Sequence, residues 1–171
     1  MIRKIVKYGD PVLEQVAEPI TEFDTPELLA LIADMWDTMY AAKGLGLAAP
    51  QIGLGRRLTV IDTSQGEDES RKFILINPEI IRKDGTQIGE EGCLSIPGFR
   101  EQVKRANKVR IRAHNEKGHV VEHEGEELLA RAMQHEIDHL NGILFIKHVS
   151  TLKRDLIRRK IRKLQKAGEW D

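Results

Sequence analysis

The stretch Gln134-His135-Glu136-Ile137-Asp138-His139-Leu140-Asn141-Gly142 contains the pattern His-Glu-x-x-His. The apolar residues in and before it recur at three- and four-residue spacing, which predicts a helix that ends at Gly142: Leu128, Leu129, Ala132, Met133, Ile137 and Leu140. Residues four apart lie on one face of a helix, so His135 and His139 can point their imidazoles at one metal ion. Glu136, beside them, can reach a metal-bound water. The pattern therefore indicates a metal-dependent hydrolase.

A pair of helical histidines can also be held by hydrogen bonds in a core, so a third ligand decides between a metal site and a structural pair. The extended zinc-peptidase signature needs a histidine where this chain has Phe145, which excludes that subclass. The lone cysteine, Cys93, is a candidate because one Cys and two His form an open metal site, although a single thiol can equally be buried and inert. The other candidates are the remaining histidines: His114, His119, His123 and His148.

The composition predicts one domain spanning residues 1–171, because a chain of this length buries a sizeable core. It is 40% hydrophobic and 32% charged, with 27 basic and 27 acidic side chains, which argues against disorder. The first nine residues lack the apolar segment of a signal peptide, and no run of about 18 apolar residues occurs. We therefore expect a cytoplasmic protein without a membrane span. A single cysteine leaves no internal disulfide, which fits a reducing compartment.

A first helix is predicted with Thr25 as N-cap, Pro26 at the first helical position and Gly44 after its end. Strands are predicted at residues 57–62, 72–77, 109–114 and 119–124, and residues 80–83 are expected to continue into a turn at Asp84-Gly85. This order differs from the regular alternation of a parallel sheet. It predicts an α+β fold with mainly antiparallel strands around a central metal-binding helix, a first helix near the amino terminus and a carboxy-terminal helix. The histidines in the hairpin at 109–124 are expected to be solvated rather than ligating.

Residues 152–171 are predicted to form a basic carboxy-terminal helix or tail. Residues 153–166 hold eight Lys or Arg against one acid, Asp155, which gives this segment a net charge of +7. A charged run is usually only a solvated face. Here the apolar residues recur at helical spacing and the charge density is high, which favours docking on an anionic surface.

Three separated stretches resemble, in order and spacing, the motifs of the bacterial-type class of peptide deformylases. They are Gly44-Leu45-Gly46-Leu47-Ala48-Ala49-Pro50-Gln51-Ile52-Gly53, Glu91-Gly92-Cys93-Leu94-Ser95, and Gln134 to Gly142. The resemblance extends over essentially the whole chain. It implies an enzyme that removes the N-formyl group from the formyl-methionine of newly made polypeptides and releases formate. Two rival functions are a zinc metallopeptidase of the His-Glu-x-x-His type and a non-catalytic metal module bound to ribosomes.

The resemblance also implies a role for each motif residue. The ligands of one divalent metal would be Cys93, His135 and His139. Fe²⁺ is the expected ion, and Zn²⁺, Ni²⁺ or Co²⁺ are alternatives. Glu136 would act as general base and then as general acid. The oxyanion would be stabilised by the Gln51 side-chain amide and the Leu94 backbone N–H.

The resemblance further implies which surfaces meet the substrate and its source. The substrate is the N-formyl-methionyl end of a nascent peptide. Its contacts are expected at Leu45, Gly46, Glu91, Gly92, Arg100, Leu128 and Ala132. The basic carboxy-terminal helix would bind the ribosome surface, as in bacterial members of this family. A monomer is expected.

Overall fold

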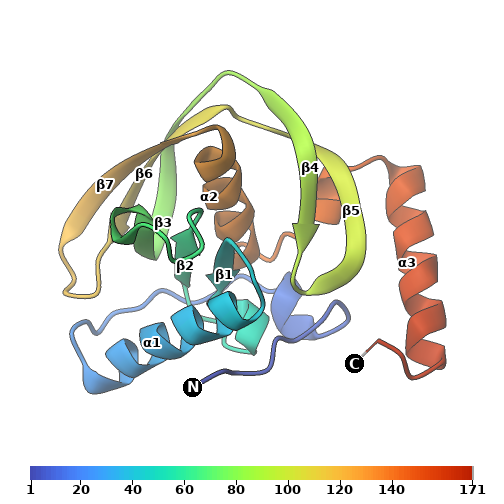
Figure 1. The fold of residues 1–171 in the computed structure, drawn as a ribbon, viewed down its shortest axis with the longest axis horizontal. Coiled ribbons are helices and arrows are strands. Elements are labelled where there is room, and N and C mark those ends of the chain that lie inside the picture. The colour runs from blue at the N-terminus through green and yellow to red at the C-terminus, as the bar shows by residue number, and fades with distance from the viewer. Residues whose placement is uncertain (171) are drawn as a thin grey trace.

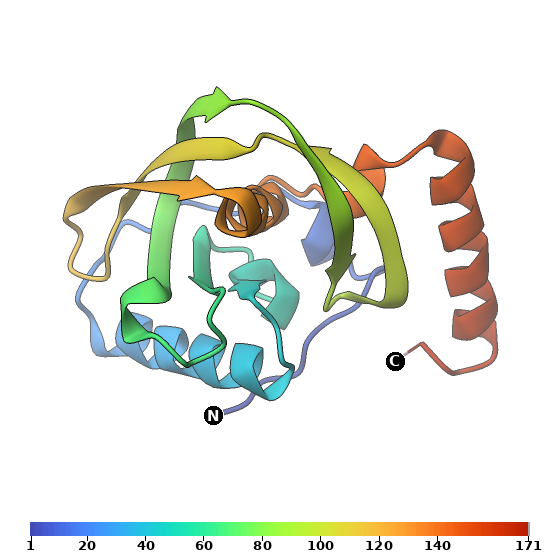
Figure 2. The same ribbon diagram turned by 45° about the horizontal axis from the view of Figure 1, so that its top comes forward.

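A helix in the middle of the molecule, α2 (Glu127–Leu140), carries the His-Glu-x-x-His stretch. The computed structural model describes residues 1–170. Asp171, the last residue of the predicted basic segment, lies outside the described residues. Figure 2 shows α2 nearly end on, with strands curving around it. The predicted α+β arrangement of mainly antiparallel strands around a central helix is confirmed.

One side of α2 faces a five-stranded antiparallel sheet in the order β1-β2-β3-β6-β7. Its strands are β1 (Gly46–Ala48), β2 (Leu58–Asp62), β3 (Lys72–Asp84), β6 (Lys108–His114) and β7 (Val120–Glu126). The strand predicted at 72–77 continues through residues 80–83, which the sequence placed before a turn, to form the single strand β3. Its pairing with β6 is irregular between Ile76 and Glu79, around Pro78, because proline has no N–H to donate to the ladder.

A second, two-stranded sheet stands on the other side of α2 (Figure 1). It is the hairpin of β4 (Gln87–Cys93) and β5 (Ile96–Arg105). The sequence did not predict this hairpin, because glycines, a proline and charged residues interrupt any apolar alternation in it. The hairpin matters for the site because Cys93 is the last residue of β4.

Two further helices flank this arrangement. The first, α1 (Pro26–Ala41), begins as predicted, since the Thr25 hydroxyl accepts a hydrogen bond of 3.1 Å from the Leu28 N–H. The last, α3 (Thr151–Lys166), stands at one side of the molecule (Figure 1) and buries only Ile157 and Ile161. No helix within residues 1–170 combines the length and apolar character needed to span a bilayer.

The centre of α2 is enclosed on all sides, not along one stripe. Every residue from Ala130 to Ile137 is buried. Met133 and Ile137 pack against the sheet in a cluster that includes Ile61 and Ile111. Four of the enclosed residues are polar or charged: Arg131, Gln134, His135 and Glu136. Burial of polar and charged groups is costly unless they have hydrogen-bond or charge partners, so the partners of these four residues indicate the role of α2.

The turn after α2 yields a prediction about stability. Gly142 has φ +73°, and a Cβ there would lie 2.8 Å from the carbonyl carbon of Glu14. Gly142→Ala should lower the free energy of unfolding by about 2–5 kcal/mol. The left-handed backbone conformation contributes about 1–2 kcal/mol of this loss, and the steric overlap of the added Cβ contributes about 1–3 kcal/mol. Gly168→Ala is the matched control, since φ is +70° but a Cβ would meet nothing within 4 Å. Equal losses in urea unfolding would contradict the close approach at Gly142.

Candidate metal centre

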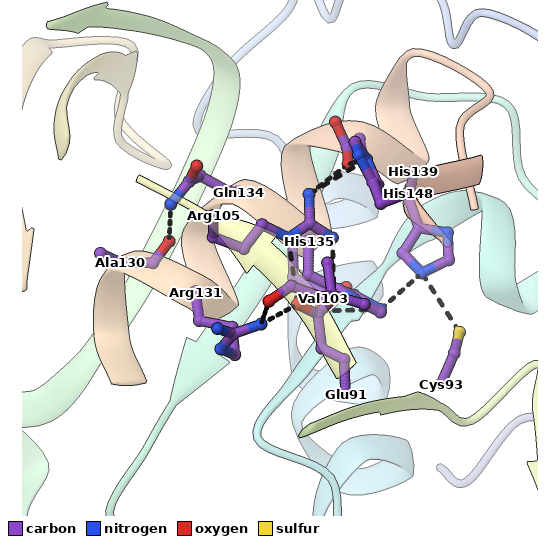
Figure 3. Close-up of polar contacts among 12 residues, drawn as sticks. Glu91, Cys93, Val103, Arg105, Ala130, Arg131, Gln134, His135, His139 and His148 are labelled. Atoms are coloured by element: carbon purple, nitrogen blue, oxygen red, sulfur yellow. Dashed lines mark hydrogen bonds and ion pairs between the residues drawn. The ribbon is translucent and has the colours of Figure 1, made fainter. Parts of the chain in front are cut away.

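Three donor atoms from two elements converge beside the middle of α2. The Nε2 atoms of His135 and His139 are 3.2 Å apart, and Cys93 Sγ lies 3.4 Å from His139 Nε2 (Figure 3). All three lie within 4.8 Å of one another, and within residues 1–170 no other group of His, Cys, Asp or Glu side chains gathers in this way. Two imidazoles and a thiolate are a known ligand set for divalent transition metals. The donor set therefore fits a metal ion.

The ring of His135 is oriented by Glu91, a residue of β4. His135 Nδ1 lies 2.7 Å from Glu91 Oε1. With the proton on Nδ1 donated to the carboxylate, the lone pair of Nε2 faces Cys93 and His139, as metal binding requires. Burial opposes a charge on His135, but Glu136, Cys93 and Glu91 raise its pKa well above the usual value. The site thus attracts positive charge at the place where the ligands converge.

The Glu91 carboxylate is held by two arginines as well. Arg105, at the end of β5, donates from Nη2 and Nε to its two oxygens at 2.7 and 3.0 Å. Arg131 of α2 donates to Oε2 and to the Val103 carbonyl. Burial alone would raise the pKa of Glu91, yet the hydrogen bonds from His135 and Arg105 hold it well below its ordinary range. Glu91 is therefore ionised.

His139 lies deeper and is completely buried. Burial lowers its pKa well below the usual value, so the ring is neutral and able to act as a ligand. Asp138, its neighbour, points the other way. The Asp138 carboxylate accepts from Arg105 at 2.6 Å and lies 2.8 Å from His148 Nε2, so this pair extends the network toward the surface.

Glu136 points toward the ligand atoms from the same helix. Its Oε2 is 4.0 Å from His135 Nε2, and its Oε1 is buried with no hydrogen-bond partner among residues 1–170. A Cβ at Gly46 would lie 2.8 Å from Oε2, so glycine there leaves room for the carboxylate. Burial raises the pKa of Glu136 to about 7. A carboxylate with this pKa can both take and return a proton near neutral pH.

Gln51 brings an amide group to the same place. Its Oε1 accepts from the Ala48 N–H at 3.0 Å, which fixes the side chain. Its Nε2 therefore faces Cys93 Sγ at 3.6 Å and Ser95 Oγ at 3.3 Å. Leu94 follows Cys93 in the turn between β4 and β5, so its backbone lies beside the same group.

A cavity of about 450 Å³ opens onto these atoms. Twelve of the thirteen predicted site residues line it, and the exception, His139, lies behind His135. The predicted substrate contacts in its wall are Leu45, Gly46, Glu91, Gly92, Arg100, Leu128 and Ala132. Two of them have side chains engaged elsewhere. The Glu91 side chain faces arginines and His135, and Arg100 forms an ion pair with Glu90 at the exposed rim.

The other candidate ligands lie away from this group. His114 is half-buried against Phe23, with ring centroids 5.1 Å apart, and His123 is half-buried against Phe73, with ring centroids 5.0 Å apart. They are therefore partly packed against aromatic rings, whereas His119 is exposed, as the sequence predicted for all three. Sequence reasoning also missed Arg105 and Arg131. The available signal was an arginine between two alanines in the apolar part of the helix, Ala130-Arg131-Ala132, which implies a buried acidic partner.

Comparison with known proteins agrees with this geometry. The family model for polypeptide deformylase matches residues 2–155. The chain belongs to the peptide deformylase family. It is 63% identical over 170 residues to a peptide deformylase of Acidobacterium capsulatum, covering 99% of each chain. It is 47% identical over 167 residues to one of Alkalilimnicola ehrlichii, covering 98% of this chain and 93% of that protein.

Solved structures give the same answer. A crystal structure of a peptide deformylase from Legionella pneumophila superposes with a TM-score of 0.91 at 46% identity, covering 100% of this chain and 99% of that one. The chain is thus a peptide deformylase, a metal-dependent hydrolase that removes N-formyl groups from nascent peptides. The findings support this function and give no support to the alternative of a zinc metallopeptidase.

The ligand set yields a prediction about metal content. Cys93→Ala removes one of three donors, so bound metal per polypeptide and deformylase activity should both fall at least tenfold. His123→Ala, a histidine on β7 packed against Phe73, should keep its metal. Inductively coupled plasma mass spectrometry of dialysed protein measures both. Retention of metal by the Cys93 variant, or its loss from the His123 variant, would show that the ligand is a different residue.

Proposed function

We propose that Fe²⁺ bound by Cys93, His135 and His139 and a proton relay through Glu136 carry out deformylation at this site. The observation that carries the proposal is the convergence of three donor atoms within 4.8 Å beside a buried carboxylate that has no partner among residues 1–170. When bound, the metal lowers the pKa of a water ligand toward neutrality and polarises the formyl carbonyl. Iron is proposed from the family resemblance, and the thiolate and imidazole ligands also suit zinc, nickel and cobalt.

Glu136 is proposed to move the proton that hydrolysis requires. Its Oε1 takes a proton from the attacking water and later delivers it to the departing amine. The products are formate and a free α-amine. A pKa of about 7 supports both roles, because the ionised and protonated forms are then nearly equal in free energy at neutral pH.

Two donors are proposed to stabilise the negative charge that develops on the formyl oxygen. Gln51 Nε2 is held in the site by the bond between its Oε1 and the Ala48 N–H. The backbone N–H of Leu94 is the second donor. Each such donor contributes about 10²–10³ in rate in other hydrolases, since it is fixed before the charge appears.

The peptide is proposed to enter as an added strand between β1 and β4. Both are edge strands of their sheets within the described chain, and both contribute backbone to the cavity wall. An extended peptide can pair with such edges through its own N–H and C=O groups. Gly46 and Gly92 keep the two edges open. The methionine side chain would then lie toward Leu128 and Ala132 of α2.

We further propose that the chain acts as a monomeric, one-domain enzyme in the cytoplasm, docked on the ribosome through α3. Six basic side chains of α3 are exposed: Lys153, Arg159, Lys160, Arg162, Lys163 and Lys166. Leu152 and Leu156 are also exposed on this helix, with relative exposures of 71% and 46%. A helix with this mixture of cations and apolar groups suits a surface of ribosomal RNA and protein.

The proton relay is tested by Glu136→Gln in anaerobically prepared, Fe²⁺-loaded protein. The variant keeps all three ligands, so its metal content should stay near that of the wild type. Formate release from a formyl-Met tripeptide at saturating substrate should fall by about 10²–10⁴. Glu127→Gln, an exposed residue at the start of α2, is the control and should keep its turnover.

Two results would contradict this proposal. Substantial formate release by Glu136→Gln would mean that the proton travels by another route. Faster turnover by a Zn²⁺-loaded sample of equal metal content would argue against iron, while leaving the hydrolase itself in place.

Ribosome docking is best tested without truncation. Ile157, Ile161 and Trp170 belong to the same buried cluster as Leu13 and Phe145, so deletion of residues 152–171 would expose a core. Replacing the exposed Arg159, Lys160, Arg162 and Lys163 by Gln should weaken co-sedimentation with ribosomes about tenfold or more at low salt, and less at high salt. The matched control replaces four exposed cations elsewhere: Arg82, Lys83, Lys104 and Lys117. Equal binding by the two variants would exclude α3 as the docking surface.

A further inference from the structure

A second cavity adjoins the catalytic one and is not used by the mechanism above. Its wall is formed by Tyr40, Lys43, Gly44, Gln65, Gly66, Glu69 and Lys72. Lys43 and Gly44 line both cavities, so the two meet at the segment that leads into β1. The second cavity has a volume of about 530 Å³, enough for one or two amino-acid side chains.

The wall of this cavity is held in place by a buried carboxylate. Asp62, fully buried at the end of β2, accepts from Tyr40 Oη at 2.6 Å, from the Ser64 N–H at 2.9 Å and from the Gly66 N–H at 2.8 Å. Gln65 Nε2 donates to the Lys43 carbonyl at 2.9 Å, which ties this loop to the entrance of the catalytic cavity. The cavity is therefore built by specific contacts and is not a gap beside a loose loop.

Two cations and one acid line this cavity, namely Lys43, Lys72 and Glu69, while the buried carboxylate of Asp62 lies behind the wall and is not among the lining residues. Lys72 Nζ lies 5.2 Å from the ring centroid of Trp36 and 5.7 Å from that of Tyr40, so its ammonium group is positioned above two aromatic rings. Lys43 is exposed at the junction of the cavities. The acid in the wall, Glu69, is 3.1 Å from Lys72 but its side chain is 84% exposed. An exposed pair of this kind is weak, so a ligand carboxylate can take the place of Glu69.

We propose that this second cavity binds the third and fourth residues of the formylated peptide and favours acidic side chains there. A strand that pairs with the β1 edge and has its formyl group beside Gly46 and Glu136 runs past Gly44 toward Lys43. Three residues of extended chain cover about 10 Å, which brings the third or fourth residue to the junction. Lys43 and Lys72 then face its side chain.

The inference rests on the proposed path of the peptide and is tested by comparing matched substrates. Formyl-Met-Ala-Ser-Glu and formyl-Met-Ala-Ser-Lys amides are assayed separately at low ionic strength, and the ratio of their kcat/KM values is taken within each enzyme. This ratio cancels any general change in the catalytic site. The wild type should prefer the Glu peptide by about two- to five-fold, and added salt should reduce the preference.

Single substitutions then assign the preference to this cavity. Lys72→Met and Lys43→Met, which keep the apolar stems, should bring the ratio to about one or below, and Lys72→Arg should restore it. Glu69→Gln should increase it. Lys117→Met, at an exposed turn of the β6–β7 hairpin, is the control for the same loss of charge and should leave the ratio at the wild-type value.

The outcomes separate this inference from the function itself. If the wild type releases formate from both peptides with equal kcat/KM values, the second cavity is not a peptide subsite. The same conclusion follows if the preference for the Glu peptide persists in both Lys43→Met and Lys72→Met. Absence of formate release from either peptide by metal-loaded wild-type protein would instead overturn the proposed deformylation. A ratio that changes as much in Lys117→Met as in Lys72→Met would show a long-range charge effect and would also reject the subsite.

Discussion

The buried carboxylate of Glu91 is the contact on which the site depends, because it joins the two elements that carry the candidate ligands Cys93, His135 and His139. It stands on β4 two residues before Cys93, and it is bonded to Arg105 of β5 and to Arg131 and His135 of α2. It thereby fixes the hairpin that carries the thiol against the helix that carries the imidazoles. Loss of one partner from a buried charge of this kind costs about 3–5 kcal/mol, so the network resists partial disruption.

The charges in this network are balanced without any contribution from the histidines. Glu91 and Asp138 are matched by Arg105 and Arg131. His135 is consequently free to be neutral when a metal takes up the positive charge that the site attracts. Asp138 ties the same network to His148, so the network runs from His135 to an exposed side chain beyond α2 (Figure 3). One set of ion pairs thus supports both the fold and the orientation of the ligands.

Hydrophobic periodicity was sufficient to predict α1, α2, α3 and most of the five-stranded sheet. The α1 boundary followed from Thr25 and Pro26, whose capping geometry is local and does not depend on the rest of the fold. The β4–β5 hairpin could not be predicted in this way. Four consecutive residues of β4, Glu90 to Cys93, line the cavity, and β5 buries Ile96 and Val103 at irregular spacing, so neither strand shows a regular alternation of apolar and polar residues. Hydrophobic periodicity detects strands that bury one face in a core, whereas this hairpin lines a cavity that is open to solvent.

The members of the site were easier to predict than their contacts. Spacing alone placed His135 and His139 on one face, because a helix fixes residues four apart regardless of context. The roles of Arg105 and Arg131 depend on contacts across 14 and 40 positions of sequence with Glu91, which no local pattern encodes. Glu91 was expected among the substrate contacts. Its side chain instead meets His135, which leaves only its backbone to face a peptide.

The candidate ligands come from two elements, β4 and α2, and this affects how metal binding is coupled to folding. The histidines are arranged as soon as α2 forms, but Cys93 reaches them only when the hairpin docks and Glu91 meets its arginines. A metal at this site therefore binds the folded chain in preference to the unfolded one and connects β4 to α2 at a second point, beside the Glu91 network. The open edges of β1 and β4 lie on either side of that connection. The two sheets are not hydrogen-bonded to each other within residues 1–170, so the ion pairs of Glu91, together with the metal when it is bound, hold the hairpin against α2. We therefore expect the cavity to accept an extended peptide without separation of the hairpin from the helix.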